Sequence, residues 1–222
     1  MRYNSFIIGF VLLFSGVHVL VGQTLKNRRD TISYAAGVSI ATSFQRHGAG
    51  DLDVDLITRA IRDVMQANHE NKTLIEKNLC QKLFDDYVVD IKRQPGRNFL
   101  KQNATEDGVV VLPSGLQYKV LKKGGQGGEK PKISDTVKVH YTGKLIDGTV
   151  FDSSKKNGEP AEFPVSKVIK GWTEGLQLME VGDQFIFYIP AELGYGERGA
   201  GGKIAPYATL IFEVELIEIV KQ

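Results

Sequence analysis

The spacing of apolar residues changes once along this chain, and that change limits the folds open to it. Between about residues 30 and 94 apolar side chains recur every three or four positions, as on one face of a helix. Beyond Asp107 and Gly108 they alternate with polar residues and are often β-branched, as in half-buried strands. The sequence therefore predicts an α+β protein, with an all-α N-terminal domain followed by an antiparallel sheet.

The N-terminal pattern is most simply interpreted as three helices. The first covers residues 31–46. The second begins after Asp51 or Asp53, both of which are favoured N-cap residues. The third begins at a capping box over residues 73–76. We expect Pro95-Gly96 to interrupt this helix, because proline lacks an amide hydrogen and clashes with the preceding turn.

The third helix carries more apolar surface than one small core needs. Its apolar residues form two stripes, Ile75/Leu79/Leu83/Tyr87 and Cys80/Phe84/Val88/Ile91. One interpretation buries both stripes within a single chain, although three short helices make only a marginal core. The interpretation that we favour is a homodimer that covers the remaining stripe. The single cysteine, Cys80, is expected to be a small core residue rather than a nucleophile.

The first residues have the features of a secretory signal peptide. Arg2 precedes an apolar run over residues 6–21, and the small residue Gly22 precedes polar Gln23. We expect cleavage after Gly22 and a periplasmic or otherwise exported protein. The alternative is an uncleaved membrane anchor, although the run is short and interrupted for a membrane span.

The C-terminal pattern predicts strands around one short helix. Val137, Val139 and Tyr141 share one face of a strand, and Asp147-Gly148 is typical of a hairpin turn into the next. The only helical spacing lies at about residues 172–179. An antiparallel sheet wrapped over one amphipathic helix is the most economical fold.

Motifs in this half closely resemble the FKBP family of peptidyl-prolyl cis/trans isomerases. They are Val-His-Tyr-Thr-Gly at 139–143, Asp-Gly-Thr-Val-Phe-Asp-Ser-Ser at 147–154, Val-Ile-Lys-Gly-Trp at 168–172, Tyr-Gly at 195–196 and the strand at 208–216. The resemblance covers nearly all of residues 133–222. Residues 112–120 are further similar to the two-domain bacterial branch, the Mip-like and FkpA-like proteins, whose N-terminal helices form a dimer. Together with the N-terminal apolar run and the helical pattern, the resemblance predicts a signal peptide at 1–22, a helical dimerisation domain with its connecting segment at 23–111 and an isomerase domain at 112–222.

The resemblance also implies an aromatic cup that binds proline. Its catalytic residues would be Asp152, Tyr195 and Tyr141, and its substrate-binding residues Phe151, Val168, Ile169, Trp172 and Phe212. The Tyr195 hydroxyl would hold the substrate carbonyl after proline, and Asp152 would contact the twisting amide or tether Tyr141. The sequence departs from the eukaryotic pattern at Ala161, where an aromatic residue often lines the cup, and at Ala200, where histidine often occurs.

The implied partners are proline-containing unfolded or partly folded proteins, a second copy of the chain and macrolide inhibitors. Neither a cofactor nor a metal is expected. A formal net charge of +2 gives no electrostatic footprint for nucleic acid. The alternative function is a non-catalytic chaperone or peptide-binding module that uses the same cup. A third and least favoured interpretation is an interaction protein with a purely structural role.

Overall fold

A computed structural model of the chain describes residues 25–66, 73–125, 127–156 and 158–221. The chain forms two compact units, Met1–Phe44 and Gln45–Gln222, each of which is described by itself. The expected signal peptide lies outside the described residues. In the described ranges, no helix has both the length and the apolar character that a membrane crossing requires.

The described part of the N-terminal half contains three helices, as the periodicity predicts. They are α1 (Arg28–Arg46), α2 (Val54–Met65) and α3 (Lys77–Asn103). The Asp53 side chain caps α2 by accepting hydrogen bonds from the amides of Asp55 and Leu56, which confirms one of the predicted caps. No residue of α1 is buried.

The predicted capping box at the start of α3 is wrong. Thr73 does not accept a bond from an amide of the helix, because its hydroxyl donates to the carbonyl of Ile75 at 2.6 Å. The N-cap residue is Glu76, whose side chain makes no capping bond. The local sequence pattern is present, but the helix begins three residues later than the box requires, with Glu76 rather than Thr73 as the N-cap.

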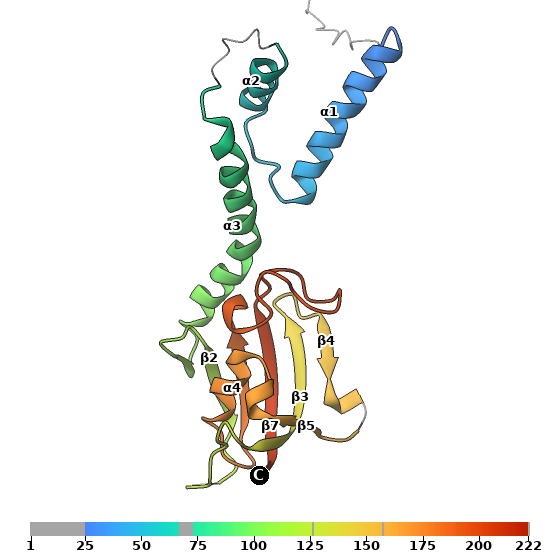
Figure 1. Cartoon of the computed structure of the whole chain (residues 1–222). Helices are drawn as coiled ribbons and strands as arrows, with labels where there is room; N and C mark the ends of the chain where they lie inside the picture. The colour runs from blue at the N-terminus through green and yellow to red at the C-terminus, as the bar shows by residue number, and fades with distance from the viewer. Residues whose placement is uncertain (1–24, 67–72, 126, 157, 222) are drawn as a thin grey trace, which may run out of the picture. The chain divides into compact units, whose positions relative to one another are not determined.

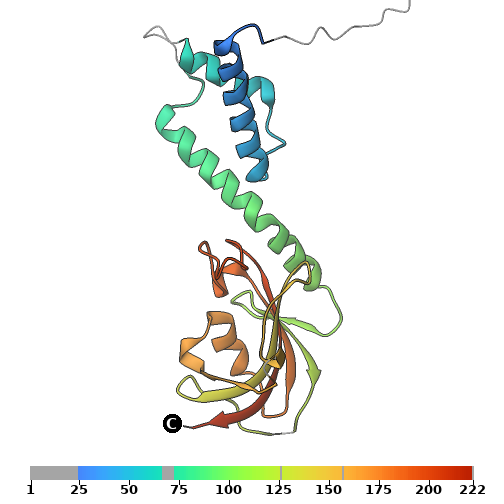
Figure 2. The ribbon, with the colours of Figure 1, turned by 90° about the vertical axis from the view of Figure 1, so that its right-hand side faces the viewer.

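The predicted interruption at Pro95-Gly96 is also wrong, since α3 continues through Pro95 to Asn103 (Figure 2). Proline inside a helix costs roughly 3 kcal/mol. Tertiary packing offsets this cost: Gly96 is buried, and a Cβ atom added to it would lie 2.3 Å from Oγ1 of Thr209. The helix therefore packs closely on the C-terminal half at the turn where its backbone is weakest.

Cys80 is not the core residue that was expected. Its side chain is exposed, and its Sγ donates to the carbonyl oxygen of Glu76, the N-cap residue of α3, at 3.4 Å. Leu79 and Leu83 on the same helix are 43% and 46% exposed, and Ile75, just before the helix, is 46% exposed. Among the described residues, the apolar surface at this end of α3 therefore stays partly exposed.

The C-terminal half is an antiparallel sheet with one helix against it, as predicted (Figure 1). In the described residues the sheet has seven strands in the order β1-β2-β6-β7-β3-β4, with β5 also paired to β3. The strands are β1 (Val109–Val111), β2 (Gln117–Lys122), β3 (Thr136–Leu145), β4 (Val150–Ser153), β5 (Ala161–Pro164), β6 (Gln184–Ile189) and β7 (Leu210–Val220). Neighbours pair antiparallel throughout, and the long β3–β7 pair forms the centre.

Helix α4 (Lys170–Leu176) packs closely on one face of this sheet. Gly171 and Gly175 make this approach possible, because a Cβ atom at either would lie 2.6 Å from Ile189 or Phe187 of β6. Leu176 and Trp172 on the same helix are buried in the core. The sheet and α4 together enclose the hydrophobic core and leave a hollow at one end of the helix.

Candidate active site

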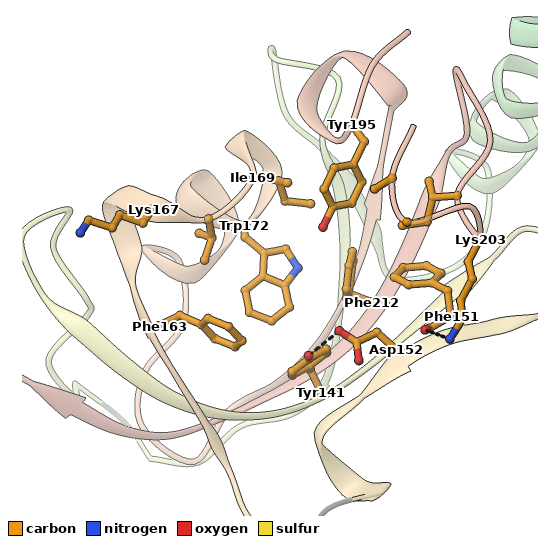
Figure 3. Close-up of a pocket in the computed structure, with 14 residues that line it drawn as sticks. Tyr141, Phe151, Asp152, Phe163, Lys167, Ile169, Trp172, Tyr195, Lys203 and Phe212 are labelled. Carbon is orange, nitrogen blue, oxygen red and sulfur yellow. Dashed lines mark hydrogen bonds between the residues drawn. The ribbon is translucent and has the colours of Figure 1, made fainter. Parts of the chain in front are cut away.

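A cavity of about 430 Å³ opens between α4, the central strands and the loop that connects β6 to β7. Figure 3 shows its aromatic lining. All of the sequence-predicted site residues line this one cavity: Tyr141, Phe151, Asp152, Val168, Ile169, Trp172, Tyr195 and Phe212. The structure therefore brings together side chains that are spread over more than 70 positions of the sequence.

Alternation along the strands aims the aromatic side chains into the cavity. Tyr141 on β3 and Phe212 on β7 belong to the buried faces of their strands. Phe151 lies on β4, and Asp152 follows it with its side chain exposed at the rim. Trp172 projects from the first turn of α4.

Trp172 forms the floor of the cup and is only 4% exposed. Its ring meets those of Tyr141, Phe163 and Phe212 edge to face, with centroid distances of 5.3, 5.6 and 5.1 Å. Phe151 packs edge to face on Phe212 at 5.4 Å. Such contacts are worth about 0.5–1.5 kcal/mol each beyond area burial, so the rings stabilise one another as the walls of the cup.

Gly143 leaves room for two of these rings. A Cβ atom at this position of β3 would lie 2.6 Å from the ring of Phe151 and 2.8 Å from that of Phe212. No side chain larger than hydrogen fits without moving one ring. The glycine of the Val-His-Tyr-Thr-Gly motif thus has a packing role in the cup.

Tyr141 and Asp152 form the polar pair of the cup. The Tyr141 hydroxyl donates a 2.7 Å hydrogen bond to Oδ2 of Asp152. Oδ1 of the same carboxylate accepts a bond from the amide of Ser153 at 2.9 Å. Burial, and secondly the bond to the carboxylate, raise the pKa of the Tyr141 phenol well above its ordinary value. Tyr141 therefore stays neutral and fixed in orientation.

Tyr195 reaches the cup from the β6–β7 loop and is 39% exposed. Its pKa is raised, mainly by partial burial and further by the negative charge of Asp152. The hydroxyl is thus a neutral donor. The indole Nε1 of Trp172 is a second donor beside the cup, since it is buried without a partner among the described residues and faces the side of Tyr195 (Figure 3).

Sequence reasoning missed several residues that line the cavity. They are Phe163, Lys167, Gly201, Lys203 and Ile204, together with Ala200, which had been noted only as a departure from the family pattern. Phe163 supplies the aromatic wall that appeared to be missing at Ala161. The signal was the period of two residues along β5, which places positions 161 and 163 on one face.

Chemically, the cup offers an apolar enclosure with neutral hydrogen-bond donors at its edge. Its one carboxylate, Asp152, is engaged by Tyr141 and Ser153. At the rim, Nζ of Lys203 donates a 3.4 Å hydrogen bond to the carbonyl oxygen of Phe151. Such a site can remove water from a small apolar group and hold one carbonyl oxygen.

Both halves of the chain match known protein families. Residues 127–217 match the family described as FKBP-type peptidyl-prolyl cis-trans isomerase. Residues 29–120 match the domain amino terminal to FKBP-type peptidyl-prolyl isomerase.

Full-length relatives share this organisation. The FKBP-type 22 kDa peptidyl-prolyl cis-trans isomerase of Escherichia coli is 44% identical over 207 residues, which cover 92% of each chain. The outer membrane protein MIP of Legionella longbeachae is 41% identical over 89% of this chain and 88% of its own length. The crystal structure of FkpA from Escherichia coli matches with a TM-score of 0.56 and 32% identity, over 89% of this chain and 99% of FkpA.

Proposed function

Because this chain belongs to the FKBP-type peptidyl-prolyl cis-trans isomerases, it catalyses rotation about X-Pro bonds, and we propose that its aromatic cup does so by desolvation. The observation that carries this proposal is the convergence of Tyr141, Trp172 and Phe212 on one cavity. The proline ring would sit on the indole of Trp172, which forms the floor.

The physics of the reaction explains why such a cup is sufficient. Rotation about the bond passes through a twisted amide at a cost of roughly 18–20 kcal/mol. Twisting removes the resonance that places charge on oxygen and nitrogen, so the transition state is less polar than the planar ground state. Water stabilises the planar amide more than the twisted one, and a dry cup reverses that preference. A ten-thousandfold acceleration requires about 5.5 kcal/mol of such differential binding.

The polar residues have distinct roles in this proposal. The Tyr195 hydroxyl donates to the substrate carbonyl after proline, because it is a neutral donor at the open side of the cup. Asp152 tethers Tyr141, as their 2.7 Å hydrogen bond supports, and its charge faces the twisting amide. Phe151, Val168 and Ile169 shape the walls.

A proline-isomerisation assay tests this function. The purified chain should accelerate the cis-to-trans change of a Leu-Pro or Phe-Pro peptide, and Trp172→Ala should reduce the rate strongly. Lys130→Ala, in the exposed loop far from the cup residues in sequence, is the matched control and should be fully active. Rates equal to those of the uncatalysed peptide would favour the alternative, a chaperone that binds proline-containing segments without catalysing their isomerisation.

We also propose that the helical domain, residues 23–111, makes the protein a homodimer. Support comes from α1, which has no buried residue, and from the exposed side chains of Leu79 and Leu83 on α3 and of Ile75 just before it. A contiguous apolar surface of this kind is unusual on a monomer. Two cups held in one particle would raise the effective concentration for a long unfolded client.

The protein is further proposed to be exported, with residues 1–22 as its signal peptide and residues 112–222 as its isomerase domain. The apolar run near the N-terminus and the name of the Legionella relative, an outer membrane protein, support this location. Its clients would be proline-containing exported proteins that are still folding. Macrolide inhibitors would compete for the same cup.

A further inference from the structure

The loop that carries Tyr195 is in contact with helix α3. This loop, residues 191–209, connects β6 to β7 and is called the Tyr195 loop here. It also supplies Ala200, Lys203 and Ile204 to the cup. The last turns of α3 lie against it, although α3 itself contributes no residue to the cavity (Figure 1).

Arg93 of α3 contacts both ends of this loop. Its guanidinium lies over the ring of Tyr207, 4.7 Å from the centroid, which is a cation–π geometry. Its Nε is 3.8 Å from Oε1 of Glu192 at the start of the loop. The Nε atom is buried and makes no hydrogen bond among the described residues. The Tyr207 ring and the Glu192 carboxylate are therefore the groups that stabilise the positive charge of the guanidinium.

Tyr207 links Arg93 to Gly196, the residue that follows Tyr195. Its amide donates a 2.8 Å hydrogen bond to the carbonyl of Gly196. Tyr207 is also the only non-glycine residue of the described ranges with a positive φ, at 62°. A bulky residue holds that conformation only where its surroundings impose it. The contact with Arg93 is one such constraint.

A second contact fixes the end of the loop. Gly96, one turn further along α3, packs on Thr209, which is 4% exposed and directly precedes β7. The helix thus touches the loop at its first turn, at Tyr207 and at Thr209. The part of the loop between these points carries Tyr195.

We propose that Arg93 is a positioning residue for the isomerase reaction, acting through Tyr207 and Gly196 to hold the Tyr195 hydroxyl at the cup. This inference rests on the proposed role of Tyr195 and adds to it a residue outside the cavity. It assigns the C-terminal part of α3 a function in catalysis on short peptides, independent of any dimer.

The test is a double-mutant cycle on the full chain with a short Leu-Pro peptide. Arg93→Ala should lower kcat/KM by roughly two-fold, less than the loss expected when the Tyr195 hydroxyl is removed altogether. Arg93→Lys keeps a cation over the ring and should restore most of this loss. In a Tyr195→Phe background, Arg93→Ala should have almost no further effect, because the hydroxyl that it positions is already gone.

Matched variants separate positioning from folding. Arg97→Ala removes an exposed arginine of the same helix that pairs with Asp90 and should leave kcat/KM unchanged. Tyr207→Leu removes the other partner of the contact and should reproduce the loss without adding to that of Arg93→Ala. This second variant also tests the proposal if Arg93→Ala does not fold, as judged by the fluorescence of Trp172, the only tryptophan.

Two results would overturn the proposal. One is full activity in folded Arg93→Ala or Tyr207→Leu, which would leave the isomerase function itself intact. The other is an undiminished effect of Arg93→Ala in the Tyr195→Phe background, which would show a route that does not involve the hydroxyl. A wild-type chain without isomerase activity would instead remove the function on which the inference rests.

Discussion

The Tyr141 hydroxyl and the Asp152 carboxylate are joined by a 2.7 Å hydrogen bond across strands β3 and β4. Asp152→Leu removes the acceptor and leaves the partly buried phenol without its partner. We expect kcat/KM on a Leu-Pro peptide to fall by about ten-fold, equal to roughly 1.4 kcal/mol of transition-state stabilisation. Tyr195→Phe should cost less, about three-fold, because the ring still fills the cup. Full activity in both folded variants would leave desolvation alone as the source of the rate.

Gly143 should tolerate no side chain. Gly143→Ala places a methyl group against Phe151 and Phe212, and overpacking of this kind costs about 1–3 kcal/mol. We expect lower stability in urea and a kcat/KM reduced by about ten-fold, because the cup walls shift. Gly125→Ala is the control, since a Cβ atom there meets nothing within 4 Å. Equal activity of the two variants would contradict the packing role.

Asp183 should make stability depend on pH. Its side chain is fully buried and accepts hydrogen bonds from the amides of Gly124 and Glu180 at 2.9 and 3.0 Å and from the Lys123 ammonium at 3.0 Å. Burial alone would raise the pKa of this carboxyl, but the amide donors and Lys123 outweigh it and lower the pKa. The stabilisation is therefore complete above the unfolded pKa of about 3.9 and is lost as pH falls through the lower folded value.

Asp183→Asn measures this contribution. The variant should unfold about 1–3 kcal/mol more easily than the wild type near pH 7, because the charge-assisted bonds are lost. The difference should shrink as the pH is lowered below about 4. Denaturant titrations followed by Trp172 fluorescence give both values. A difference that stays constant down to acid pH would show that the charge of Asp183 is not responsible, and Asp90→Asn on the exposed face of α3 serves as the control.

The exposed stripe of α3 should control the oligomeric state. Leu79→Glu with Leu83→Glu places charges on the proposed interface, and light scattering should then show a monomer where the wild type is a dimer. Activity on a short peptide should remain, whereas refolding of a proline-limited protein should become less efficient. Lys92→Glu changes the charge of α3 outside both stripes and should stay dimeric. A wild-type monomer at micromolar concentration would refute the dimer.

Much of the cup could be read from the sequence because its residues lie in short motifs with strong local signals. The alternation that places Tyr141 on the buried face of its strand is a property of every strand. Trp172 is the last residue of the motif Val-Ile-Lys-Gly-Trp, which is typical of the family. Phe163 was missed because the position expected to be aromatic, Ala161, was judged alone rather than with the residue two places along the same face.

The sequence alone determined where helices give way to strands, because periodicity and turn chemistry act over a few neighbouring residues, and its resemblance to the family indicated which motifs form the cup. Only the tertiary structure decided that α3 runs through Pro95, that Cys80 lies exposed and that Arg93 meets Tyr207. These features depend on contacts between segments far apart in the chain. Packing at Gly96 and Thr209 outweighs a local helix breaker, and no pattern within one segment reports that balance.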